Sequence, residues 1–228
     1  MNLTENLGRK AGLFYLLVAV FAGYAQFIRT SMIVPGDATA TVNHIMASEA
    51  LFRVGIVSDL IGQIFHVLLI LVLYQLFKTV NHNQSRLMFT LALIPVPIAC
   101  INMVNQFAPL LLLNGSIYRN ISEPAQLHAQ ILFFLDLHKH GILIAQLFWG
   151  LWLLPLGYLA FRSEFIPQIF GILLMAACIG YVVGSFITFL FPNYEAMFKW
   201  VYIEPAIAEI SFAFWLLIKG VNYSGLKS

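Results

Sequence analysis

"GIVSDLIGQIFHVLLILVLYQLF" occupies residues 55–77 and is long and apolar enough to cross a lipid bilayer as one α-helix. Asp59, Gln63 and His66 interrupt this stretch at spacings of four and three residues, which places all three side chains on one face of a helix. The opposite face consists of Ile, Leu and Val. Because a carboxylate at the centre of a membrane helix costs about 2.5–3.5 kcal/mol to insert, the polar face is expected to point away from lipid.

The composition of the whole chain is that of an integral membrane protein. Of its 228 residues, 61% are hydrophobic and only 10% are charged, whereas soluble domains carry about 25% charged residues. The net charge of +2, without any Lys/Arg-rich run, gives no sign of nucleic-acid binding. Cys100 and Cys178 lie within apolar runs and are expected to be buried thiols rather than a disulfide or a metal site.

Six apolar runs meet or nearly meet the length of about 20 residues that a spanning helix needs. They comprise residues 11–28, 54–77, 87–113, 141–161, 166–191 and 198–221. Proline removes a backbone donor and clashes with the preceding turn, so it bends, breaks or starts a helix. Such points are expected at Pro95 and Pro97 in the third run, Pro155 in the fourth and Pro205 in the sixth.

An even number of spans places both chain ends on the same side of the membrane. If the N-terminus is cytoplasmic, the inner segments hold more Lys and Arg residues than the outer segments, as the positive-inside rule requires. We therefore expect a single transmembrane domain over residues 1–228 in the bacterial inner membrane, with both termini in the cytoplasm. The fold class is all-α, an integral membrane bundle of six helices with short interfacial helices on the outer side.

The first interfacial helix is expected within residues 35–53. A Pro-Gly turn opens this segment, and Asp37 follows as a helix N-cap. Val42, Ile45 and Met46 then fall on one side of the helix, which predicts that this side packs against apolar surroundings.

The second interfacial helix is expected within residues 122–141, with Ser122 as its cap, Pro124 in its first turn and Gly141 at its end. His138, Lys139 and His140 make this segment too polar to continue simply into the fourth span.

Small residues recur at four-residue spacing in the fifth span, at Ala176, Gly180 and Gly184. Small side chains let helix backbones approach closely in lipid, where packing drives association. This stripe predicts a central helix that packs either within the chain or against another copy in a homo-oligomer.

Polar side chains gather in the outer halves of the spans, whereas the inner halves are almost purely apolar. This asymmetry predicts a polar pocket that opens outward and is closed inward by an apolar plug. The candidate ligand-binding residues are Asp59, Gln63, His66, Asn105, Gln146 and Glu209. Arg29 and Arg53 are candidate ion-pair partners for the acids.

A metal site and a hydrolase site are alternative interpretations of the same residues. A metal site would need further ligands beside Asp59, drawn from His128, Asp136, His138 and His140. No HExxH or equivalent spacing exists, so neither a metal nor another cofactor is expected. Ser58 beside Asp59, together with a histidine, is similar to the combination of Ser, Asp and His in membrane hydrolases of the alkaline ceramidase type. The paired histidines on the final helix of those hydrolases are missing here.

Three stretches resemble a bacterial family of multi-pass membrane proteins catalogued as domain of unknown function 4386. They are "MIVPGDATATVNHIMASEALFRVGIVSDL" (32–60), "FRSEFIPQIFGILLMAACIGYVVGSF" (161–186) and "PAIAEISFAFWLLIKG" (205–220). The resemblance implies a multi-pass membrane protein but no activity, substrate or catalytic residue. The matching motifs also include Glu49, which would lie just outside the membrane near Arg53. The other residues in the matching motifs are Pro35, Gly36, Asp37, Ser58, Asp59 and Glu209.

Three hypotheses of function follow from these residues. The leading one is binding of a small polar solute or cation in the outward pocket, extended in its wider form to transport, with Asp59 and Glu209 carrying charge or protons. The second is an intramembrane hydrolase acting on a lipid or prenyl chain, metal-dependent in one form, that uses Asp59, His66 and Glu209. The third is an accessory membrane subunit whose polar groups are structural.

Overall fold

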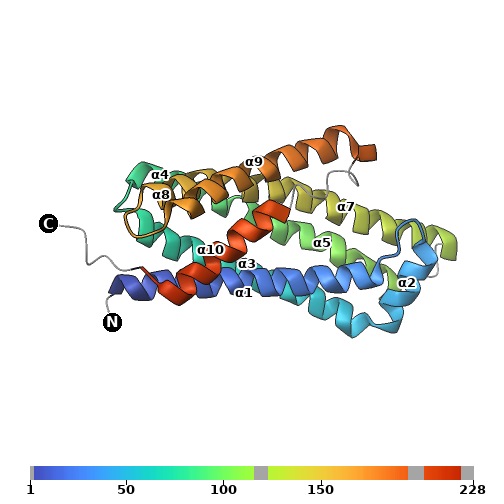
Figure 1. Cartoon of the computed structure of the whole chain (residues 1–228). Helices are drawn as coiled ribbons and strands as arrows, with labels where there is room; N and C mark the ends of the chain where they lie inside the picture. The colour runs from blue at the N-terminus through green and yellow to red at the C-terminus, as the bar shows by residue number, and fades with distance from the viewer. Residues whose placement is uncertain (1–2, 116–122, 195–202, 222–228) are drawn as a thin grey trace. The chain divides into compact units, whose positions relative to one another are not determined.

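The computed structural model describes residues 3–115, 123–194 and 203–221. These residues are predominantly helical, and no strand occurs among them (Figure 1). Five helical stretches of the described chain are long and apolar enough to cross a membrane, which confirms an all-α membrane protein. They are Asn6–Met32, Glu49–Phe77, His82–Asn114, Pro124–Arg162 and Gln168–Leu190.

The helices follow the predicted runs, and those of the first four runs extend beyond them, whereas those of the last two runs lie within them. In chain order they are α1 (Leu3–Met32), α2 (Ala38–Ala47), α3 (Glu49–Phe77), α4 (His82–Leu93), α5 (Pro95–Asn114), α7 (Pro124–Leu151), α8 (Leu153–Arg162), α9 (Gln168–Leu190), a 3₁₀ turn at Pro192–Tyr194, and α10 (Ile203–Lys219). α10 has only 17 residues, and residues 195–202 lie outside the described part. The sixth span therefore stays a prediction.

Prolines mark the breaks between helices. α4 ends at Leu93 and α5 begins at Pro95, while α8 begins two residues before Pro155. Pro205 lies in the first turn of α10, where its missing N–H is not needed for an intrahelical bond. The positions predicted from these prolines are confirmed. Pro109 lies inside α5 without ending it.

The short helix expected within residues 35–53 is present as α2 (Ala38–Ala47). The Asp37 side chain accepts a hydrogen bond from the Ala40 N–H at 2.8 Å, as an N-cap does. Val42 and Ile45 are buried, whereas Met46, on the same predicted side, is 57% exposed. Thr41 takes the third buried position, because its hydroxyl bonds to the backbone carbonyls of Val34 and Asp37.

The prediction of a separate helix ending at Gly141 is wrong. α7 runs without interruption from Pro124 through His138 and Gly141 to Leu151, and Ser122 lies outside the described residues. His138 does not interrupt the span because it is buried and hydrogen-bonded to Asn102. The neighbouring Lys139 is exposed on another side of the helix.

Two compact units make up the chain. The first comprises Met1–Val18, Ile64–Val96 and Leu143–Ser228, and the second comprises Ala19–Gln63 and Pro97–Ile142. α1, α3, α5 and α7 each contribute to both units. The polar face of α3 is therefore divided, with Asp59 and Gln63 in the second unit and His66 in the first. The single transmembrane domain predicted above stays a prediction.

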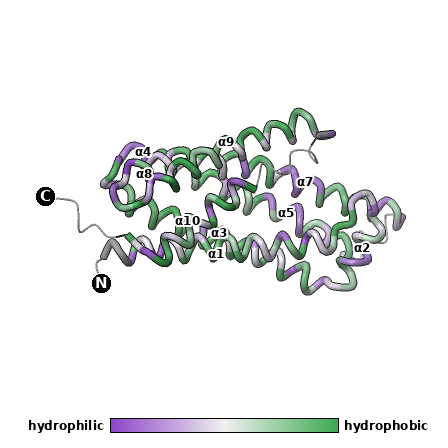
Figure 2. Tube along the Cα trace, in the orientation of Figure 1, coloured by the Kyte–Doolittle hydropathy of each residue, from purple (hydrophilic) through white to green (hydrophobic). Residues whose placement is uncertain are grey.

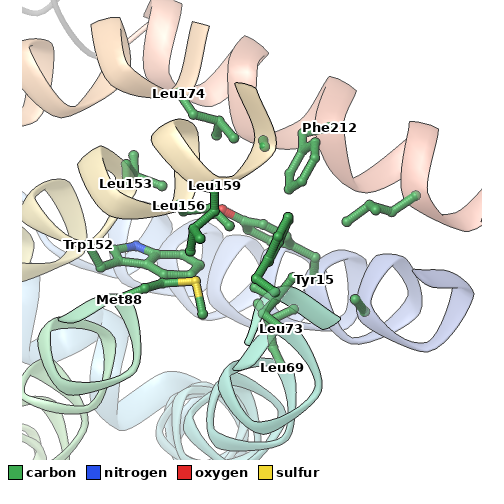
Figure 3. Packing of buried hydrophobic residues seen from close by; sticks show 14 of the residues in the cluster. Tyr15, Leu69, Leu73, Met88, Trp152, Leu153, Leu156, Leu159, Leu174 and Phe212 are labelled. Atoms are coloured by element: carbon green, nitrogen blue, oxygen red, sulfur yellow. The ribbon is translucent and has the colours of Figure 1, made fainter. Parts of the chain in front are cut away.

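The core of the first unit is built around Trp152, which is 1% exposed. Figure 3 shows its ring beside Met88 and near leucines of α8, with Tyr15 lying between this group and Phe212. Glycines bring the helices close together here. A Cβ built on Gly157 would lie 2.7 Å from the Gly171 carbonyl oxygen, so α8 and α9 touch through their backbones.

The stripe proposed for helix association is unevenly buried. Ala176 is exposed, Gly180 is partly buried and Gly184 is buried. Homo-oligomer formation through this stripe stays a prediction.

Large apolar side chains remain exposed along the spans, as lipid contact requires. Figure 2 shows hydrophobic residues over most of α9, where Ile179 is 66% and Phe186 is 51% exposed. On α5, Ile101 is 72% and Val104 is 64% exposed. Such side chains would be costly in water but are the expected surface of a helix in hydrocarbon.

We predict that Gly12→Ala and Gly23→Ala, both in α1, have opposite effects on stability. A Cβ at Gly12 would lie 2.4 Å from the Leu217 backbone nitrogen of α10, so the helices must separate at a cost of about 1–3 kcal/mol. A Cβ at Gly23 would meet no atom within 4 Å, and alanine there should be neutral or stabilising by up to about 1 kcal/mol. Thermal unfolding in lipid nanodiscs would measure both, and equal midpoints would contradict the α1–α10 contact.

Candidate functional site: two buried polar clusters

An ion pair between Arg29 of α1 and Asp59 of α3 lies at the centre of the second unit's polar groups. The guanidinium Nη1 of Arg29 donates to Oδ2 of Asp59, and the two side chains are 13% and 9% exposed. The Nε and Nη2 atoms of Arg29 donate to Oε1 of Gln26 at 3.2 and 2.9 Å. Gln26 is itself exposed, so the pair is buried but bordered by an accessible amide.

Hydrogen bonds continue from this pair to α5 and α7. The Gln106 side chain bonds to Asp59, and its Nε2 lies 2.7 Å from Nε2 of His138. Asn102 donates to the backbone oxygen of His138 at 2.8 Å and accepts from Asn105 at 2.9 Å. We call this set the Asp59 cluster, defined as Gln26, Arg29, Asp59, Asn102, Asn105, Gln106 and His138.

Both ring nitrogens of His138 lie within hydrogen-bond distance of polar groups on α5. Nε2 lies 2.7 Å from the amide nitrogen of Gln106, which donates. Nδ1 lies 3.2 Å from the Asn102 amide nitrogen and 3.3 Å from the Asn102 carbonyl oxygen. In the ion pair beside this ring, the guanidinium of Arg29 balances the carboxylate of Asp59.

Gly141 allows α7 to approach this cluster. A Cβ at position 141 would lie 2.2 Å from Oδ1 of Asn102. Gly141 is three residues after His138, so both face α5 from the same side of the helix. The glycine that suggested the end of a helix is therefore a packing position.

A second group of polar side chains lies in the first unit, around Glu209 of α10. Oε2 of Glu209 accepts from the Tyr15 hydroxyl of α1 at 2.5 Å, and Oε1 accepts from the Tyr181 hydroxyl of α9 at 2.9 Å. The Tyr15 ring packs against Trp152, with centroids 6.0 Å apart, and edge-on against Phe212 at 6.4 Å. We call Tyr15, Tyr181 and Glu209 the Glu209 cluster.

The remaining candidates occupy different places. His66, in the first unit, is 5% exposed, bonds to the Ala92 backbone and lies 5.7 Å from Trp152, while its Nε2 has no partner. Gln146 is partly buried in α7. Arg53 pairs with Glu49 across one turn of α3 at 2.7 Å, and both side chains are substantially exposed.

Gln63 follows Asp59 by one helical turn, in the same unit. Its Oε1 atom is buried and has no hydrogen-bond partner among the described residues. The structure thus places Asp59, Asn105 and Gln63 together in the second unit, whereas His66, Gln146 and Glu209 belong to the first.

Several residues of the two clusters were not among the sequence candidates. Asn102 and Gln106 are four residues apart on α5, a spacing that signals a shared face. Tyr15 and Tyr181 carried no comparable signal, because a tyrosine in an apolar run is common and its partner is distant in sequence. Within the described ranges, no group of three or more His, Cys, Asp or Glu side chains is arranged to hold a metal ion.

The comparisons with known proteins identify a family but no activity. A family model described as a domain of unknown function (DUF4386) matches residues 10–220. An uncharacterized protein of the archaeon Archaeoglobus fulgidus is 31% identical over 85 residues, which cover 37% of this chain and 49% of that protein. The match thus spans about half the length of this curated relative. No solved structure matches the chain.

We predict that Gly141→Ala and Asn102→Ala are strongly non-additive. Gly141→Ala forces the Asn102 side chain away, and Asn102→Ala removes its bonds to His138, so each should lower stability. In the double variant the new methyl group enters the space that Asn102 has left. Thermal unfolding should therefore show a loss well below the sum of the single losses, and simple additivity would contradict the contact.

Proposed function

The chain belongs to the DUF4386 family, and we propose that it binds a small polar solute at the Asp59 cluster, with transport as the wider form of this function. The observation that carries the proposal is the buried, unpartnered Oε1 of Gln63, one turn from the Asp59–Arg29 pair. Ionisable groups within membrane-spanning helices are expensive and are, by default, candidates for a functional site.

Access to the pair supports this proposal. The amide oxygen of Gln26 accepts hydrogen bonds from two guanidinium nitrogens of Arg29, and Gln26 is exposed. A solute oxygen that replaced this amide oxygen would accept both hydrogen bonds. Asn105 is also only partly buried. Arg29 would supply donors, and Asp59 and Gln63 would supply acceptors.

The charge balance favours one class of solute. Because Arg29 already neutralises Asp59, a bound cation would bring a second positive charge close to the guanidinium. An anion would create the opposite imbalance beside Asp59. A zwitterionic or uncharged polar solute leaves the balance intact and can use both sides of the pair. We therefore favour such solutes over the cation that the sequence also allowed.

A structural role is the second candidate function. Its specific support is that both charged groups of the cluster and the His138 ring have partners within the chain. Under this alternative, the protein is an accessory membrane subunit whose polar network fixes the register of α1, α3, α5 and α7.

We predict that removing one charge of the pair is costly and removing both is not. Arg29→Gln or Asp59→Asn alone leaves an uncompensated buried charge, which costs about 3–5 kcal/mol. The double variant should recover most of this loss in thermal unfolding. Arg53→Gln with Glu49→Gln is the matched control, because this exposed pair is expected to contribute at most about 1 kcal/mol.

The same variants separate binding from structure. Wild-type protein in nanodiscs would be unfolded in the presence of L-alanine, glycine betaine, glycerol or sodium ions as probes. Solute binding predicts a saturable rise in unfolding temperature with a zwitterion or polyol, which is lost in the stable Arg29/Asp59 double variant and kept in the Arg53/Glu49 control. If no probe shifts the wild type, or if the double variant retains the shift, binding at this cluster is contradicted.

The proposed location is the bacterial inner membrane, with six spans and both termini in the cytoplasm. The charge distribution in the sequence supports this orientation. Alkaline phosphatase fused after residue 35 should be active, whereas fusions after residues 80, 164 and 228 should be inactive. An active fusion at residue 228 with inactive ones at 80 and 164 would show that α10 does not cross.

A further inference from the structure

The Glu209 cluster joins three helices through one carboxylate. Each oxygen of Glu209 on α10 accepts a tyrosine hydroxyl, from Tyr15 on α1 and from Tyr181 on α9. These bonds connect elements that are far apart in sequence, over separations of 194 and 28 residues. They lie in a core of aromatic rings, including Trp152 and Phe212.

Among the described residues, no basic group neutralises this acid. Glu209 has no ion pair with a described side chain, in contrast to Asp59 and Glu49, which pair with Arg29 and Arg53. The titratable groups that act on it are Tyr15 from α1, Tyr181 from α9 and Glu204 on α10 itself. None of these supplies a positive charge. An ionised carboxylate in such surroundings is costly, and binding a cation removes this cost.

The hydrogen bonds of Glu209 favour the smallest cation. Tyr15 is 6% exposed, whereas Glu209 and Tyr181 are partly buried. Because both carboxylate oxygens already accept a tyrosine hydroxyl, a metal ion or an organic cation would have to break these bonds. A proton needs no additional space, because it occupies the hydrogen bond itself.

We propose that Glu209 is a proton-binding site that takes up and releases one proton between Tyr15 and Tyr181. In the ionised state, both tyrosine hydroxyls donate to the carboxylate. When a proton from water binds to one carboxyl oxygen, the new O–H donates to the tyrosine oxygen beside it. That tyrosine must then turn its own hydrogen toward another acceptor, so proton uptake changes the bonding between α10 and either α1 or α9.

This site does not depend on the solute proposed for the Asp59 cluster. The two clusters belong to different units and share no residue. Loss of solute binding in the Arg29/Asp59 double variant would leave proton binding at Glu209 unaffected, and the reverse also holds.

The test is infrared difference spectroscopy of the full chain in nanodiscs, titrated from about pH 4 to about pH 9, a range that brackets the ordinary values of Glu and His. The wild type should show the C=O stretch of a protonated carboxylic acid, which disappears as the pH rises. Glu209→Gln should remove this band, whereas Glu204→Gln and the stable Arg29→Gln/Asp59→Asn double variant, the matched controls, should retain it. Tyr15→Phe and Tyr181→Phe should each move its disappearance to higher pH, because each removes a donor that favours the carboxylate.

Two results would overturn the proposal. One is a band that persists or is absent over the whole range, since Glu209 would then exchange no proton. The other is a titrating band that survives in Glu209→Gln, which would assign it to another acid. If Glu209→Gln does not fold, Tyr15→Phe and Tyr181→Phe test the proposal instead. If the carboxylic acid band disappears at the wild-type pH in both variants, the proton is not bound between these two tyrosines.

Discussion

Polar side chains within these helices must find partners inside the protein, because hydrocarbon offers no hydrogen bonds. Asp59 meets this constraint through Arg29 and Gln106, on two other helices of its unit. Since one partner lies on α1 and the other on α5, the bonds to a single carboxylate fix the relative rotation of three helices. This carboxylate therefore links α1, α3 and α5 within the second unit.

Glu209 meets the same constraint in a different way. Its partners are hydroxyl groups, which satisfy the carboxylate oxygens but do not cancel the charge. An ion pair is stable with both groups charged, and losing either charge is costly. A carboxyl bonded to tyrosines can instead keep hydrogen bonds in both protonation states, because hydroxyls donate and accept. The difference in partners is therefore a difference in what each acid is able to do.

The sequence was sufficient for the membrane class and for the breaks at prolines, because both depend on local properties. Apolar length determines which segments can span, and Pro95 lacks a backbone donor whatever it contacts. Partner choice is not local. On α3, Asp59 and His66 share a face, yet Asp59 bonds to Arg29 in one unit and His66 packs on Trp152 in the other. Spacing along a helix predicts which side chains face the same way, but not which helix they meet.

The error over α7 has the same origin. His138 and Gly141 indicate the end of a helix when they are considered alone, since a polar residue and a glycine both weaken a membrane span. Together with Asn102 they have the opposite meaning, because the amide bonds to His138 and fills the space above Gly141. A residue that is unfavourable by itself thus becomes a specific contact once its partner is present.

By the same reasoning, Oε1 of Gln63 is the most informative atom of the second unit. This atom is buried, but no described group donates a hydrogen bond to it, so the cost of burial is not compensated. Because Oε1 of Gln63 is an acceptor, it requires a solute N–H or O–H group, and a carbonyl or carboxylate oxygen cannot bond to it. The ligand of the Asp59 cluster should therefore carry a hydrogen-bond donor as well as the acceptors that Arg29 requires.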